Sequence, residues 1–239
     1  MKQYIYGKNT VIESLKGNKE IYTVYLLHND NGIISLCNKR KIATKIVDKE
    51  YLNKLTKGKN HQGIVAEVPE YKYYSLDEII NTIPSDKQPL LLMLDGLEDP
   101  HNLGAILRTC DALNVDGVII GKNRSVSLNG TVAKVSTGAI DYVKVSQVTN
   151  LSRTLDDLKK RGFWVVGCEL ENSKDYRTVD YNMPIVVVIG SEGFGISRLV
   201  KNNCDINVSI PMKGHVNSLN ASVATAVILY QVYNSRFPM

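Results

Sequence analysis

The sequence predicts an α/β protein whose larger, C-terminal part is a mostly parallel sheet with helices on both faces. Continuous apolar runs of strand length, such as 90–94 and 185–189, alternate with helical segments from residue 90 onward. Strands that are apolar on both faces are typical of parallel sheets covered on both sides. The composition, 44% hydrophobic and 22% charged over 239 residues, is that of a globular protein and excludes a disordered chain.

The same patterns place the individual elements of this C-terminal part, residues 90–239. Strands are expected at 90–94, 118–120, 142–145, 163–166, 185–189 and 206–210. Helices are expected at 103–113, 131–140, 151–161, 196–200 and from about 218 to 233.

Residues 1–70 predict a separate small α/β domain. Apolar residues at helical spacing stop at Gly17, strands are expected at 23–27 and 63–68, and Asp48 can cap a helix that ends at Gly58. Residues 71–89 are polar and contain two prolines, which predicts a linker. Within it, Ser75 begins a capping-box pattern and hence a short helix.

The net charge of +5 is unevenly distributed. Residues 1–66 hold 12 Lys and Arg against five Asp and Glu, so the rest of the chain is nearly neutral. A compact basic module indicates an arm that binds a polyanion, nucleic acid above all. A lysine-rich surface that serves solubility explains the same count, and charge alone does not separate the two interpretations.

Several classes of protein and site are disfavoured. No apolar stretch approaches the roughly 18 to 20 residues that cross a bilayer, and the first residues lack the apolar region of a secretory signal, so no membrane partner is expected. The cysteines are dispersed and the histidines lack metal-ligand spacing, so neither a disulfide framework nor a metal site is expected. Reduced thiols fit a cytoplasmic protein.

Three loops of unusual composition follow expected strands, where open parallel sheets bind ligands. The first contains Asn102 near a helix cap, and Gly104 and Arg108 share one helical face, which would leave room against the guanidinium. A surface Arg on an amphipathic helix is the alternative.

The second loop places Glu192 among three glycines, at 190, 193 and 195. Glycines let a ligand approach the backbone, whereas an acid that merely favours a helix dipole would not need them. The glycine order and the late position match the dinucleotide fingerprint poorly, which makes an NAD enzyme an unfavoured alternative. In the third loop Ser218 can cap the final helix, and capping does not require the nearby Asn220.

Together the loops resemble the signature motifs of the SpoU family of RNA ribose 2′-O-methyltransferases, in the SPOUT superfamily. The matching segments are NLGAILRT (102–109), IGSEGFGIS (189–197) and IPMKGHVNSLNASVATA (210–226), in the order that the family has. YGKNTVIESLKG (6–17) and HQGIVAEV (61–68) resemble the small substrate-binding domain in front of many members. The sequence is most similar to the bacterial enzymes that methylate a guanosine ribose of 23S ribosomal RNA.

The resemblance implies a deep trefoil knot in the catalytic domain, an N-terminal domain like ribosomal protein L30e, and a homodimer. It implies S-adenosylmethionine as cofactor, with contacts at Gly190, Ile210 and Leu219. The residues that correspond to the family's catalytic positions are Asn102, Arg108, Glu192, Ser218 and Asn220. Two alternatives stay open: a tRNA ribose 2′-O-methyltransferase, and a non-catalytic RNA-binding factor of ribosome assembly with the same fold.

Overall fold

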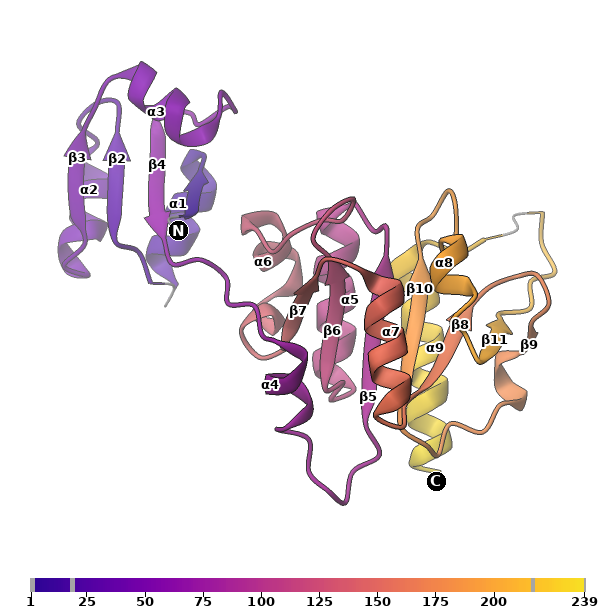
Figure 1. The fold of residues 1–239 in the computed structure, drawn as a ribbon. Helices are drawn as coiled ribbons and strands as arrows, with labels where there is room; N and C mark the ends of the chain where they lie inside the picture. The colour runs from indigo at the N-terminus through magenta and orange to yellow at the C-terminus, as the bar shows by residue number, and fades with distance from the viewer. Residues whose placement is uncertain (1–2, 18–19, 216–217, 239) are drawn as a thin grey trace. The chain divides into compact units, whose positions relative to one another are not determined.

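The computed structural model describes residues 3–17, 20–215 and 218–238. The chain divides into two compact units, Met1–Tyr71 and Lys72–Met239 (Figure 1). The expected linker 71–89 contains the helix α4 (Leu76–Ile80), which begins at the predicted capping box of Ser75 and Glu78. Ile79 of this helix is buried in the core of the second unit. Most of the segment expected to be a linker is thus part of that unit.

The first unit is a four-stranded sheet with helices on both faces. Its elements are β1 (Gln3–Tyr6), α1 (Lys8–Lys16), β2 (Thr23–Leu26), α2 (Asn31–Lys39), β3 (Ala43–Ile46), α3 (Lys49–Thr56) and β4 (Ile64–Val68). The strand order is β1-β4-β2-β3, with only the β2–β3 pair parallel. Apolar residues of α1 and α2 pack on one face, and Leu52 of α3 packs against Tyr25 and Val65 on the other.

The second unit confirms the predicted parallel sheet. Its seven strands lie in the order β7-β6-β5-β10-β8-β11-β9, and every neighbouring pair is parallel. The strands are β5 (Leu90–Asp95), β6 (Gly117–Gly121), β7 (Val145–Val148), β8 (Trp164–Cys168), β9 (Lys174–Asp175), β10 (Ile185–Gly190) and β11 (Ile206–Ser209). The central strands β5 and β10 are almost wholly buried, as continuous apolar runs require.

Helices cover both faces of this sheet (Figure 1). The longer ones are α5 (Pro100–Ala112), α6 (Gly130–Ser136), α7 (Leu151–Lys160) and α9 (Ala221–Arg236), with the short α8 (Arg198–Lys201). Side chains of α4, α7 and α8 share one core with β5, β8 and β10, while α5 packs between α6 and α9. No helix within the described ranges has the length and apolar character that a membrane span needs.

Three expected elements lie elsewhere along the chain. The strand expected at 142–145 is β7, three residues later, because a 3-10 turn (Ala139–Asp141) follows α6 first. The helix expected at 131–140 ends at Ser136, where Thr137 and Gly138 take positive φ angles. The final helix runs from Ala221 to Arg236 rather than from about 218 to 233. The knot that the resemblance implies stays a prediction.

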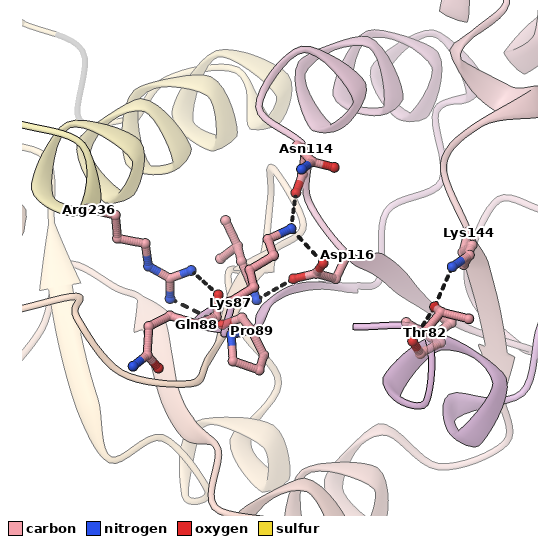
Figure 2. A network of polar contacts seen from close by, with 10 residues as sticks. Thr82, Lys87, Gln88, Pro89, Asn114, Asp116, Lys144 and Arg236 are labelled. Carbon is pink, nitrogen blue, oxygen red and sulfur yellow. Dashed lines mark hydrogen bonds and ion pairs between the residues drawn. The ribbon is translucent and has the colours of Figure 1, made fainter. Parts of the chain in front are cut away.

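The end of α9 is fixed to the sheet by one side chain (Figure 2). The Arg236 guanidinium donates to four backbone carbonyls, those of Gln88 (2.7 Å), Pro89 (3.1 Å), Tyr181 (3.0 Å) and Met183 (2.8 Å). Figure 2 labels the first two of these partners. Beside it, Lys87 Nζ contacts the Asp116 carboxylate at 2.6 Å. These contacts hold the C-terminal helix against the segments that precede β5 and β10, and so help fix the position of its other end.

Candidate active site

The three loops of the sequence analysis lie at one edge of the sheet. The first follows β5, the second follows β10 and the third follows β11. Because these strands run parallel, their carboxyl ends share an edge. Asn102, Glu192 and Asn220, which are far apart in sequence, meet there.

These three side chains form one hydrogen-bonded cluster. Glu192 Oε1 accepts from Asn102 Nδ2 at 2.9 Å and from Asn220 Nδ2 at 2.6 Å. Asn220 Nδ2 also donates to Asn102 Oδ1 at 2.9 Å. The backbone N–H of Ala221 donates a third, longer hydrogen bond to Glu192 Oε1, at 3.3 Å. The cluster therefore joins one carboxylate to two amides and to the N-terminus of α9, where negative charge is favoured.

Helix caps position both amides. Asp99 caps α5 by accepting from the His101 N–H, and Pro100 is the first residue of the helix. Asn102 lies in the first turn, near this cap as predicted, and its side chain is only 6% exposed. Asn220 is the N-cap of α9, since its Oδ1 accepts from the Ser222 and Val223 N–H groups. The prediction that Ser218 caps this helix was wrong, because the helix begins three residues after Ser218.

The loop after β10 closes on itself immediately beyond the strand. Ser191 and Gly195 exchange two backbone hydrogen bonds of 3.0 Å. A Cβ atom at Gly190 would lie 2.0 Å from the carbonyl carbon of Gly195, so only glycine fits. Gly193, by contrast, has open space around it and does not take a positive φ angle. The loop thus presents Glu192 and Phe194 on a short turn with a tightly closed base.

A cavity of about 500 Å³ opens beside this loop. Gly190, Ile210 and Leu219, the three positions that the resemblance assigns to the cofactor, all line it. Glu192 and Ser218 line it as well, so the cavity borders the cluster directly. Its volume lies in the range of small-molecule sites. Residues 216–217 of the third motif lie outside the described residues.

Arg108 lies apart from this group. It is exposed on α5 and lines neither the cavity nor the Asn102–Glu192–Asn220 cluster. The space expected at Gly104 is occupied by α6, because a Cβ there would lie 2.6 Å from the Cβ of Val135. Gly104 therefore serves the close packing of two helices, and the space predicted beside it for a ligand is filled.

Sequence reasoning missed a second carboxylate of the site, Glu169. It follows β8 and lines the cavity; its Oε1 accepts from the Ile196 N–H at 2.9 Å and its Oε2 contacts Lys201 Nζ at 3.1 Å. The hydrogen bond to Glu169 raises the pKa of Lys201, which stays charged. Glu169 thereby anchors the end of the 191–195 loop. Its position after a buried strand was the available signal.

A partly buried thiol, that of Cys168, also lines this wall of the cavity. Burial, with a smaller contribution from the charge of Glu169, raises the pKa of Cys168 to about 11. The thiol is therefore neutral at physiological pH and offers no thiolate to a ligand. Across the described parts of the chain, no group of three or more His, Cys, Asp or Glu side chains could hold a metal ion.

Comparisons with known proteins match both units. Residues 89–230 match the family model of the SpoU rRNA Methylase family, and residues 4–74 match the model described as RNA 2′-O ribose methyltransferase substrate binding. Over 99% of its length, this chain is 46% identical to the YacO protein of Bacillus subtilis (strain 168), which is named for the TrmH family of tRNA/rRNA methyltransferases. The alignment covers 97% of that protein.

Solved structures show the same fold. The SpoU methyltransferase AviRb of Streptomyces viridochromogenes, in complex with the cofactor AdoMet, superposes with a TM-score of 0.72 at 24% identity, covering 99% of this chain and 91% of that one. A TrmH/SpoU tRNA modifying enzyme of A. aeolicus superposes with a TM-score of 0.59 at 32% identity, covering 67% of this chain and 82% of that one.

Proposed function

This chain belongs to the SpoU rRNA methylase family, and from that premise we propose that it transfers a methyl group from S-adenosylmethionine to a ribose 2′-hydroxyl of RNA. The observation that carries the proposal is the cavity, which contains Gly190, Ile210 and Leu219 and borders the Asn102–Glu192–Asn220 cluster. A donor site and a polar cluster that can hold a hydroxyl thus lie side by side. We propose that the protein acts in the cytoplasm.

The residues around the cavity fit this cofactor. Glu169, Glu171 and Glu192 line it with a single lysine, Lys201, and this negative balance suits a ligand with a sulfonium and an ammonium group. Ile210 and Leu219 supply apolar surface, and the glycines around Glu192 expose backbone groups. When bound, the cofactor supplies a methyl group already activated by the positive sulfur. The chain itself has to align the hydroxyl and assist loss of its proton.

We assign Asn102 and Asn220 to positioning the ribose, Glu192 to orienting their amides, and Ser218 to a hydrogen bond near the cofactor or ribose. Arg108 stabilises the developing oxyanion or the adjacent phosphate electrostatically, because a guanidinium is almost always protonated and is a poor base. The RNA phosphate is the proton acceptor in this scheme.

The exposed position of Arg108 supports a homodimer in which a second copy brings its Arg108 to the cavity. Helix α9 supports it too, because it is apolar on its outer face as well as its inner one. The exposed apolar residues of this face are Val223, Tyr230, Tyr233 and Phe237. A face of this kind is typical of a subunit contact.

The basic first unit supports RNA as the substrate. Seven of its lysines are exposed between the end of α2 and the loop after α3: Lys39, Lys41, Lys45, Lys49, Lys54, Lys57 and Lys59. We propose a guanosine of 23S ribosomal RNA as the target, because the three motifs resemble those of enzymes of that class and the matching family model is described as an rRNA methylase family. A tRNA ribose is the second candidate, since relatives are named for both RNAs.

The test is methyl transfer from radiolabelled S-adenosylmethionine to purified ribosomal RNA and to tRNA. We expect the Arg108→Ala variant to lose most transfer while it binds the cofactor as the wild type does. A wild-type protein that binds RNA but not the cofactor would instead be the non-catalytic assembly factor. Mapping of 2′-O-methylation in RNA from cells with and without the gene then identifies the nucleotide and decides between the two RNA classes.

A further inference from the structure

A second cavity of about 390 Å³ lies on the other side of the 191–195 loop. It is formed at the carboxyl ends of β5, β6 and β7, and its lining includes Asp95, Asn123, Arg124, Asn150 and Leu199. Ser191, Phe194 and Gly195 line both cavities. The loop is therefore a thin wall, and a ligand in the second cavity would lie next to whatever the first one holds.

Phe194 is the unusual residue of this wall. Its side chain is 96% exposed, although a phenylalanine normally loses contact with water on folding. It follows Gly193 and precedes Gly195, on the turn closed by the Ser191–Gly195 hydrogen bonds. An aromatic ring presented to solvent on a short, closed turn is suited to stacking against a flat ligand.

Other residues that line the second cavity supply polar groups, which suit a nucleotide. Arg124 is exposed and takes a positive φ angle of 53°, which is uncommon for a residue other than glycine, while Asn123 adds an amide from the same segment. Asn150 contributes a second amide from the N-terminus of α7, where its Oδ1 accepts from the Arg153 N–H at 3.0 Å. Of the acids nearby, Asp95 already accepts from the Ser197 N–H at 2.7 Å.

We infer that the second cavity is a subsite for a nucleotide of single-stranded RNA, whose base stacks on Phe194 and whose phosphate contacts Arg124. An aromatic platform, a guanidinium and amides are the groups that recognise unstacked bases and their backbone. The inference rests on the proposed function in that RNA is the substrate. It adds that nucleotides next to the methylated ribose are held by the catalytic unit itself, and not only by the basic first unit.

The test measures RNA binding and not methyl transfer. The probe is a short fluorescein-labelled single-stranded oligoribonucleotide of random sequence, titrated with the full chain. Phe194→Ala and Phe194→Leu should weaken binding by roughly 5- to 150-fold, the effect of losing one stacked base, whereas Phe194→Trp should keep it. Arg124→Ala should weaken binding and flatten its dependence on salt, with unchanged affinity for S-adenosylmethionine. Trp164→Ala is the matched control, because this half-exposed aromatic residue begins β8, at the opposite edge of the sheet.

Three results would overturn the inference. One is equal RNA affinity in the wild type, Phe194→Ala and Arg124→Ala. Another is a Phe194→Leu variant that binds as tightly as Phe194→Trp, since apolar bulk alone would then suffice. The third is dissociation of the variants into smaller species in sedimentation, which would make the cavity a contact between subunits. A wild type that shows the Phe194 dependence but transfers no methyl group would refute the proposed function alone.

Discussion

The hydrogen bond between Asn102 and Glu192 can be tested by a change of one atom. In Asn102→Asp, a carboxylate oxygen replaces the amide nitrogen that donates to Glu192 Oε1 across 2.9 Å. The lost hydrogen bond to a charged acceptor costs roughly 1.5 to 3 kcal/mol. Two like charges at that distance add about 1.4 kcal/mol in water and about 6 kcal/mol at an effective dielectric constant of 20. Glu192 is exposed and Asn102 is buried, so we expect the repulsion to fall in the lower half of the range between the two Coulomb values.

The assay is urea unfolding followed by the fluorescence of Trp164, the single tryptophan of the chain, which lies in the second unit. The matched control is Asn172→Asp at an exposed turn, which should change stability little. In a Glu192→Gln background the repulsion is absent. The loss of stability caused by Asn102→Asp should therefore be smaller in that background than in the wild type, by at least about 1.4 kcal/mol.

The stability penalty of Asn102→Asp should also depend on pH, in a direction that follows from the pKa of the new carboxyl. Repulsion raises the pKa of the new carboxyl in the folded state above its unfolded value of about 4. The penalty should therefore be fully present at neutral pH and disappear, relative to the wild type, as the pH falls toward about 4. A Glu192→Gln background that leaves the cost of Asn102→Asp unchanged, or a cost that does not vary with pH, would show that the two side chains are not coupled.

Three further predictions concern the loop, the C-terminal helix and the thiols. Gly190→Ala should abolish binding of S-adenosylmethionine in calorimetry, because its Cβ would lie 2.0 Å from backbone across the loop, while Gly193→Ala should bind normally; equal binding would refute the tight closure. Arg236→Met should lower the free energy of unfolding by roughly 3 to 5 kcal/mol, since it loses four carbonyl contacts; a change below about 1 kcal/mol would contradict this estimate. Cys168 and Cys204 are partly buried, and desolvation raises their pKa values to about 11, so they should react with a thiol reagent at pH 8 more slowly in the folded than in the unfolded protein; equal rates would contradict the raised pKa values.

The sequence predicted the strands of the second unit well because both faces of its sheet are covered. An apolar run such as 185–189 has one interpretation once its length is known, and the structure extends it only to Gly190. In the first unit, β1, α2 and β3 escaped prediction. β3 is short and largely exposed, so its sequence carries little apolar signal. Helix α2 buries only Ile33 and Cys37, so its apolar pattern is short as well.

The residues of the candidate site were likewise predicted only in part. Glycines and a carboxylate after a buried strand were sufficient to identify Glu192 as a functional candidate. The link to Asn102 and Asn220 spans up to 118 residues, and no local pattern specifies such a contact. Glu169 was missed because a single acid after a strand resembles any surface residue until its partners, the Ile196 N–H and Lys201, are known.

Asn220 begins the last helix and also completes the polar cluster with Asn102 and Glu192. During translation the first two members of this cluster leave the ribosome well before the third, and Glu192 has neither its Asn220 partner nor the end of α9 to bind until that helix has emerged. A nascent chain therefore passes most of its synthesis with an unassembled centre.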